Sequence, residues 1–148
     1  MTHVRDELAG VLEAHGVQGV IDLLVSTEAH YSWAGVYVVV GDELMLGPWQ
    51  GPEATEHVRI PVGQGICGAA AASGRTEVVD DVGEDDRYLA CFASTRSEIV
   101  VPILRDGVVV GEIDIDSDQP SAFGERDRDF LEQVARLLAP EVTPELVR

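Results

Sequence analysis

The segment from residue 108 to residue 116 constrains the fold more than any other part of the chain. It reads Val-Val-Val-Gly-Glu-Ile-Asp-Ile-Asp, so acidic and apolar residues alternate within a β-branched run. Alternate side chains of a strand share a face, and the pattern therefore predicts a strand that points Glu112, Asp114 and Asp116 to one side of a sheet. Carboxylates that share a face repel one another and need a cation, a proton or open water. We expect a half-buried acidic pocket over this strand, with Glu112 solvated.

A second predicted strand, over residues 97–102, comes just before this one and is joined to it by the turn Arg105-Asp106-Gly107. It begins Ser-Glu-Ile-Val, which places Glu98 near its start, and Cys91 lies seven residues earlier in a polar loop. A thiol beside an acidic pocket is the feature of this sequence that most needs a functional explanation.

Periodicity and turn residues predict the remaining elements. They are one broken or two short helices over 4–29 with a break near Gly16, a hairpin of strands 32–40 and 43–47 around Gly41-Asp42, a break in the sheet at 47–52, short strands at 57–61 and 76–82, an Ala-rich helix after the glycine turn 63–68, and a closing helix at 123–138. This order of helices and strands predicts an α+β domain with an antiparallel sheet.

Composition fits one soluble domain. The chain has 148 residues, of which 45% are hydrophobic, so we expect a single domain over 1–148 with a helical segment at 1–30 and a core at 31–140. The formal net charge of −17 makes nucleic acid and anionic membrane surfaces poor partners. No cleavable N-terminal signal is evident, and no uninterrupted apolar run approaches the ~20 residues of a membrane span. We therefore expect a cytoplasmic protein.

The two cysteines, Cys67 and Cys91, are either small buried hydrophobic residues or redox-active residues. No Cys-x-x-Cys or His-rich spacing predicts a zinc site, and we expect neither a metal nor a cofactor. Cys67 lies at the start of the Ala-rich helix, where free backbone N–H groups favour an anion. We expect this position to lower the pKa of its thiol.

Several short motifs in one order resemble the GAF domain and, within it, the free methionine-R-sulfoxide reductases. They are Trp33-Ala34-Gly35-Val36-Tyr37, residues 46–51, Val58-Arg59-Ile60-Pro61, residues 63–68, Ala90-Cys91, Ser97-Glu98-Ile99-Val100 and Asp114-Ile115-Asp116-Ser117. The resemblance implies a six-stranded antiparallel sheet flanked by helices and a homodimer paired through the terminal helices. It also implies reduction of free methionine-R-sulfoxide, with thioredoxin as the electron donor.

The resemblance also implies roles for single residues. The family's catalytic cysteine matches Cys91, and its glycine-loop cysteine matches Cys67. The family's ligand-binding acids and aromatic cage match Glu98, Asp114, Asp116, Trp33 and Tyr37. The chain departs from the family pattern at His57, where members commonly carry a third cysteine that closes the disulfide, and in the loop 92–96.

Sulfoxide reduction needs a thiolate, a proton for the departing oxygen, and a second thiol that breaks the oxidised intermediate. Cys91, one protonated acid of the cluster and Cys67 can supply these three groups. The other two acids would hold the ammonium of a free amino acid, and the aromatic residues would surround the sulfoxide methyl group. The substrate carboxylate would bind backbone N–H groups at 63–67.

Each of these features also fits a plain structural role: buried cysteines, aromatic residues of the core, or acids on a solvated strand edge. Two other functions therefore stay open. One is a non-catalytic GAF module that binds a small ligand or senses oxidants through its cysteines. The other is a structural dimer that binds no ligand.

Overall fold

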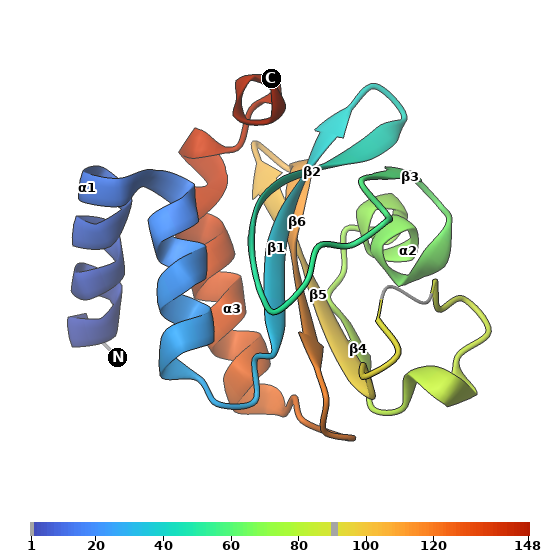
Figure 1. Cartoon of the computed structure of the whole chain (residues 1–148). Coiled ribbons are helices and arrows are strands. Elements are labelled where there is room, and N and C mark those ends of the chain that lie inside the picture. Colours follow the sequence, from blue (N-terminus) through green and yellow to red (C-terminus); the bar gives the residue numbers. More distant parts are fainter. Residues whose placement is uncertain (1, 90–91) are drawn as a thin grey trace.

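The computed structural model describes residues 2–89 and 92–148, with side chains from residue 6 onward. Within these residues a six-stranded sheet has the order β3-β2-β1-β6-β5-β4, every neighbouring pair is antiparallel, and helices cover both faces (Figure 1). The elements are α1 (Thr2–Thr27), β1 (Trp33–Val40), β2 (Glu43–Gln50), β3 (Arg59–Pro61), α2 (Gly65–Ser73), β4 (Glu77–Val79), η1 (Val82–Glu84), β5 (Ser97–Arg105), β6 (Val108–Ser117), α3 (Glu125–Leu138), η2 (Ala139–Glu141) and η3 (Pro144–Val147). The predicted α+β fold with a six-stranded antiparallel sheet is confirmed.

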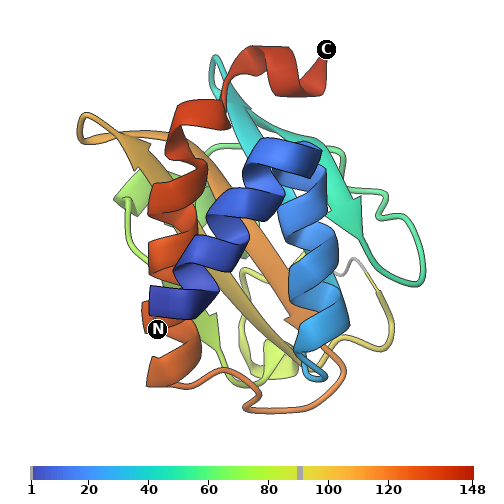
Figure 2. The ribbon, with the colours of Figure 1, turned by 90° about the vertical axis from the view of Figure 1, so that its left-hand side faces the viewer.

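The sheet separates two apolar cores. Helices α1 and α3 cover one face, as the view in Figure 2 shows, and that core contains Ile113 and Ile115 of β6. The other face lies against α2, and its core contains Tyr37 and Cys67. Since β6 sends its isoleucines to the first face, its alternate residues, the acids, point to the α2 face.

Helix α1 turns sharply at Gly16, which has φ 70° and ψ −167°. A positive φ is available to glycine at no steric cost, so the predicted break near this residue is confirmed. The halves before and after it lie side by side (Figures 1 and 2). By length and composition alone, Asp6–Thr27 would suffice for one membrane span. Its second half instead buries Val17, Val20 and Ile21 in the core, as a core helix does.

Strand β2 is longer than the sequence predicts. A break was expected at residues 47–52, but β2 continues to Gln50, and Trp49 pairs with Gly35 of β1. The pairing shifts register between Gly35 and Tyr37, so a bulge takes up the extra residue where Pro48 has no N–H to donate. This bulge keeps Trp49 in the sheet.

The glycine turn before α2 forms as predicted. Gly63 and Gly65 have φ of 98° and 67°. A Cβ on Gly68 would lie 2.8 Å from the carbonyl oxygen of Pro61, so only glycine allows the helix to approach the end of β3 this closely. The turn presses the first residues of α2 onto the sheet.

Candidate functional site

Three neighbouring strands present the predicted polar and aromatic residues to the α2 face. Asp116 of β6 pairs with Trp33 of β1 on one side and with Glu98 of β5 on the other. Two residues earlier, Asp114 pairs with Gly35 of β1. The acids of β6 therefore form a column between an aromatic strand and a second acidic strand.

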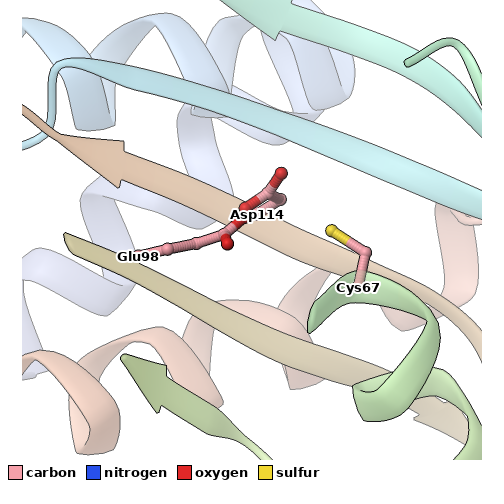
Figure 3. A group of neighbouring side chains, drawn as sticks. All are labelled: Cys67, Glu98 and Asp114. Atoms are coloured by element: carbon pink, nitrogen blue, oxygen red, sulfur yellow. The ribbon is translucent and has the colours of Figure 1, made fainter. Parts of the chain in front are cut away.

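Helix α2 closes this face with a thiol. Cys67, in the first turn of α2, points toward Glu98 and Asp114 (Figure 3), and the ligand atoms of the three residues lie within 4.8 Å of one another. The exposed fractions are 6% for Cys67, 3% for Glu98 and 1% for Asp114. Asp116 is also buried and accepts a hydrogen bond from the hydroxyl of Thr95, at 3.2 Å. We call these four residues, Cys67, Glu98, Asp114 and Asp116, the acid–thiol cluster.

Asp114 and Asp116 of this cluster resist ionisation. Burial raises the pKa of both Asp114 and Asp116, and the charge of Asp114 raises that of Asp116 further. Hydrogen bonds with Glu98 lower both pKa values in part. One oxygen of each aspartate, Oδ1, is buried with no hydrogen-bond partner in the described parts of the chain. The cluster therefore favours any group that brings positive charge into it.

The prediction that the start of α2 lowers the pKa of Cys67 is wrong. Burial raises the pKa of this thiol well above its ordinary value, and the charges of Asp114 and Glu112 raise it further. The partial positive charge of a helix start cannot offset the loss of water and several nearby carboxylates. Cys67 is consequently a neutral thiol near pH 7.

The prediction that Glu112 is solvated is also wrong. Its side chain is 0% exposed, and it lies between Tyr37 of β1 and Pro102 of β5 in the sheet register. Burial raises its pKa well above the ordinary value, the charge of Asp114 adds to this, and the nearby thiol of Cys67 offsets the rise only in part. The alternation that places Asp114 in the site also places Glu112 there, and this was the signal available in the sequence.

Replacing Glu112 by valine should stabilise the protein. An acid whose folded pKa lies above its unfolded value, here 4.5, binds its proton more tightly when folded, so its contribution to stability falls as pH rises above that value. Wild type should therefore lose stability between pH 5 and pH 8. At pH 8 Glu112→Val should gain about 1–3 kcal/mol, because valine has a similar volume and no buried polar atoms. This corresponds to a rise in Tm of roughly 3–10 °C.

Thermal unfolding followed across this pH range measures both effects. Glu56→Val is the matched control, since Glu56 is exposed and the change in net charge is the same. It should leave both the Tm and its pH dependence nearly unchanged. A lower Tm for Glu112→Val at pH 8 would show that the carboxyl group is paired in solution.

Trp33 forms an aromatic wall beside the acids. It is 2% exposed, stacks on Trp49 with ring centroids 6.1 Å apart, and lies at 5.6 Å from the ring of Phe92. A Cβ on Gly35 or on Gly51 would lie within 2.5 Å of its ring, so both glycines are needed for this position. Sequence reasoning identified Trp33 but missed Trp49 and Phe92, because the bulge in β2 and the loop path bring them here.

Tyr37, the other predicted cage residue, lies four residues beyond Trp33 on β1. It is fully buried in the core that includes Cys67, and its hydroxyl donates to the backbone oxygen of His57 at 2.7 Å. It therefore anchors the segment in front of β3. His57 itself is partly exposed.

Cys91, the predicted nucleophile, lies outside the described residues. The chain on either side of positions 90 and 91 contacts the site: Phe92 packs against Trp33, and the side chain of Leu89 lies beside Gly65 at the start of α2. The described residues on both sides of Cys91 thus lie beside Trp33 and the start of α2.

A separate cleft of about 580 Å³ lies between α1 and α3, on the opposite face of the sheet. Tyr31 donates a hydrogen bond to Asp127 there at 2.8 Å, and His30 shares the same carboxylate oxygen at 2.7 Å. Because the sheet separates this cleft from the acid–thiol cluster, the two are distinct.

Comparisons with known proteins identify a family and several relatives of this chain. The GAF domain family model matches residues 19–142. The free methionine-R-sulfoxide reductase of Escherichia coli (strain K12) is 40% identical over 116 residues, which cover 78% of this chain and 69% of that protein. The protein of that name from Saccharomyces cerevisiae is 42% identical over 111 residues, which cover 72% of this chain and 61% of the yeast protein.

Solved structures of free methionine-R-sulfoxide reductases have the same fold as this chain. The type II free methionine-R-sulfoxide reductase from Thermoplasma acidophilum superposes with a TM-score of 0.85 at 38% identity, covering 95% of this chain and 97% of its own. The free methionine-R-sulfoxide reductase of Neisseria meningitidis, solved in complex with its substrate, gives 0.86 at 36% identity, covering 94% and 86%. The resemblance carried by the sequence motifs is confirmed, and the chain belongs to the GAF domain family and, within it, to the free methionine-R-sulfoxide reductase family.

Proposed function

We propose that this protein reduces free methionine-R-sulfoxide to methionine with a redox-active cysteine, and that thioredoxin returns the electrons. The observation that carries the proposal is the acid–thiol cluster, which is buried beside the aromatic wall of Trp33. Buried carboxylates suit the ammonium of a free amino acid, and a peptide-bound methionine has no such group. Membership of the reductase family and the substrate complex of the Neisseria relative support the same substrate.

In this proposal the site binds the ammonium, the sulfur-bound methyl group and the carboxylate of the substrate with three different sets of groups. Glu98, Asp114 and Asp116 bind the ammonium, and the face of Trp33 contacts the methyl group on the electron-poor sulfur. The carboxylate binds backbone N–H groups in the first turn of α2. Residues 65–67 are the candidates for this contact, because the N–H of Gly63 already donates to the carbonyl oxygen of Gly68 and that of Gln64 to the carbonyl oxygen of Pro61.

The reductive step transfers oxygen from one sulfur to another. The Cys91 thiolate attacks the sulfoxide, the bond from methionine sulfur to oxygen breaks, and Cys91 becomes a sulfenic acid while methionine sulfur gains two electrons. A protonated carboxyl of the cluster donates to the oxygen, and this balances the proton lost by the Cys91 thiol. The raised pKa values of Asp114 and Asp116 favour such a proton donor at neutral pH.

The enzyme then has to be restored. The thiol of Cys67 attacks the Cys91 sulfenic acid, the sulfur–oxygen bond breaks, and the hydroxyl leaves as water with the thiol proton. The resulting disulfide is reduced by exchange with the dithiol of thioredoxin. Because Cys67 is neutral at pH 7, its proton has to leave within this step, and a neighbouring carboxylate is suited to carry it.

The decisive test is oxidation of NADPH coupled through thioredoxin reductase and thioredoxin. Free methionine-R-sulfoxide should support turnover, whereas the S epimer and a peptide-bound sulfoxide should not. If none is turned over while a small molecule binds tightly at the acid face, the protein is a ligand-binding or redox-sensing GAF module instead.

The resolving step gives a prediction of its own. Cys67→Ala should block thioredoxin-driven turnover while sparing one stoichiometric reduction, and oxidised wild type should contain a Cys67–Cys91 disulfide. Adding His57→Cys to Cys67→Ala restores a second thiol at the position that the family commonly uses, so multiple turnover should return. Mass spectrometry and turnover assays measure both effects. If oxidised wild type shows only sulfenic acid or mixed disulfides at Cys91, the donor attacks Cys91 directly.

We further propose that the protein works in the cytoplasm as a single-domain homodimer paired through its terminal helices. Helix α1 supports this assembly because it leaves Val11, Leu12 and Leu23 only partly buried. Light scattering should give a mass near twice the 15.9 kDa of one chain. A mass of one chain across micromolar concentrations would contradict the dimer.

A further inference from the structure

The acid–thiol cluster has more potential ligand groups than are needed to bind the ammonium group of a single amino acid. Its thiol and carboxylates come from three elements, α2, β5 and β6, and converge on one point (Figure 3). The Oδ1 atoms of Asp114 and Asp116 and both carboxyl oxygens of Glu112 are buried without hydrogen-bond partners in the described residues. Each of these carboxylates lies close enough to Cys67 for its charge to act on the thiol, so together they form a set of ligands that a cation could use.

The spacing of these atoms fits a small metal ion. Zinc binds sulfur at about 2.3 Å and carboxylate oxygen at about 2.0–2.2 Å, so neighbouring ligand atoms of a tetrahedral site lie roughly 3.4–3.8 Å apart. The ligand atoms of Cys67, Glu98 and Asp114 lie within 4.8 Å of one another. Side-chain rotations that shift them by about an ångström would close the site around an ion.

The types of ligand select the class of metal. Magnesium and calcium require oxygen ligands, whereas a mixed set of thiolate and carboxylates suits zinc and cobalt. Asp116, two residues beyond Asp114 on β6, has a further buried oxygen with no hydrogen-bond partner in the described residues.

We propose that Cys67, Glu98 and Asp114 bind one divalent ion of the zinc class, and that this ion and the ammonium of an amino acid substrate exclude one another. The metal site stands on the geometry alone. The exclusion rests on the proposed function, because it requires the substrate ammonium to occupy the same carboxylates. Free zinc would then hold the protein in a form closed to substrate.

Cobalt(II) is the probe for the metal site, because its thiolate complexes show an intense sulfur-to-cobalt charge-transfer band in the near ultraviolet. Anaerobic titration of reduced protein should produce this band, saturating at one ion per chain. The band should persist in Cys91→Ser, where Cys67 is the only thiol left, and disappear in Cys67→Ser. Asp114→Asn should weaken cobalt binding by at least about tenfold, because it removes the charge of a direct ligand, and even loss of a group that only orients a ligand costs about 10–100-fold.

Asp118→Asn is the matched control, since Asp118 lies just beyond β6, is exposed, and carries the same charge. It should leave the band and its titration unchanged. Two results would overturn the metal site. One is a charge-transfer band that disappears in Cys91→Ser and persists in Cys67→Ser. The other is binding of several ions that is indifferent to Cys67 and Asp114, as expected for a chain of net charge −17.

Zinc inhibition tests the exclusion. In the thioredoxin-coupled assay zinc should raise the apparent KM for free methionine-R-sulfoxide without changing kcat, and excess sulfoxide should displace cobalt from the protein. Unchanged cobalt spectra at saturating sulfoxide would overturn the exclusion. A protein that shows the cobalt band and no turnover would refute the proposed function and leave the metal site standing.

Discussion

Cys91→Ser should abolish turnover of free methionine-R-sulfoxide. The proposed reaction oxidises the Cys91 sulfur by two electrons, and a serine hydroxyl can neither accept the sulfoxide oxygen in this way nor form a disulfide. The first step is lost, so even a single stoichiometric reduction should disappear. Quenched single-turnover mixtures analysed for methionine give the measurement.

Cys67→Ala is the matched comparison for this prediction, because it also removes one thiol but should keep the stoichiometric reduction. Circular dichroism and Tm of Cys91→Ser should match wild type, since serine is close to cysteine in size. If Cys91→Ser reduces one equivalent of sulfoxide, Cys91 is not the nucleophile. Cys67 would then be the thiol to test.

Asp114→Asn and Glu98→Gln should each weaken substrate binding by about 10- to 150-fold. Loss of one hydrogen bond to a charged group costs about 1.5–3 kcal/mol, and each variant removes one partner of the substrate ammonium. Tryptophan fluorescence offers a direct titration, because both tryptophans of the chain, Trp33 and Trp49, stack on each other beside the acids of β6.

The same variants should keep or raise the Tm in the absence of ligand. Both remove a carboxylate from a group of like charges that burial already disfavours, so their removal relieves repulsion. Asp118→Asn, an exposed change of the same kind, should alter neither affinity nor Tm. A sharp loss of stability in both cluster variants would mean that the acids hold the fold together.

Much of this architecture was predictable because its signals are local. The alternation around Asp114 fixes which residues of β6 face α2, and the glycine turn at Gly63 fixes where that helix begins. The end of β2 was not predictable, since the bulge near Pro48 exists only through pairing with β1. Local pattern determines the face of a strand, while its length depends on its neighbour.

The sequence motifs indicated which residues lie together, but not their electrostatics. The motifs pointed to Cys67, Glu98 and Asp114, which the structure brings together. The pKa of Cys67 was predicted in the wrong direction because burial raises it first, and the carboxylates that raise it further come from strands far along the chain. Burial of Glu112 was missed for a related reason, since it depends on how far β1, β5 and α2 cover the middle of β6.

The pairing of β1 with β6 determines when the candidate site forms during folding. The sheet order places strands β1 to β3 on one side of this pairing and β4 to β6 on the other, so the first and second halves of the sheet meet only there. Trp33 of β1 and Asp116 of β6 are partners in that pairing, so the candidate site forms only when the two halves of the sheet come together. Contacts of such long sequence separation are the slowest to form. A ligand that binds only when β1 and β6 are paired stabilises the strand pairing with the largest sequence separation in the sheet. Substrate would therefore raise the stability of the folded chain.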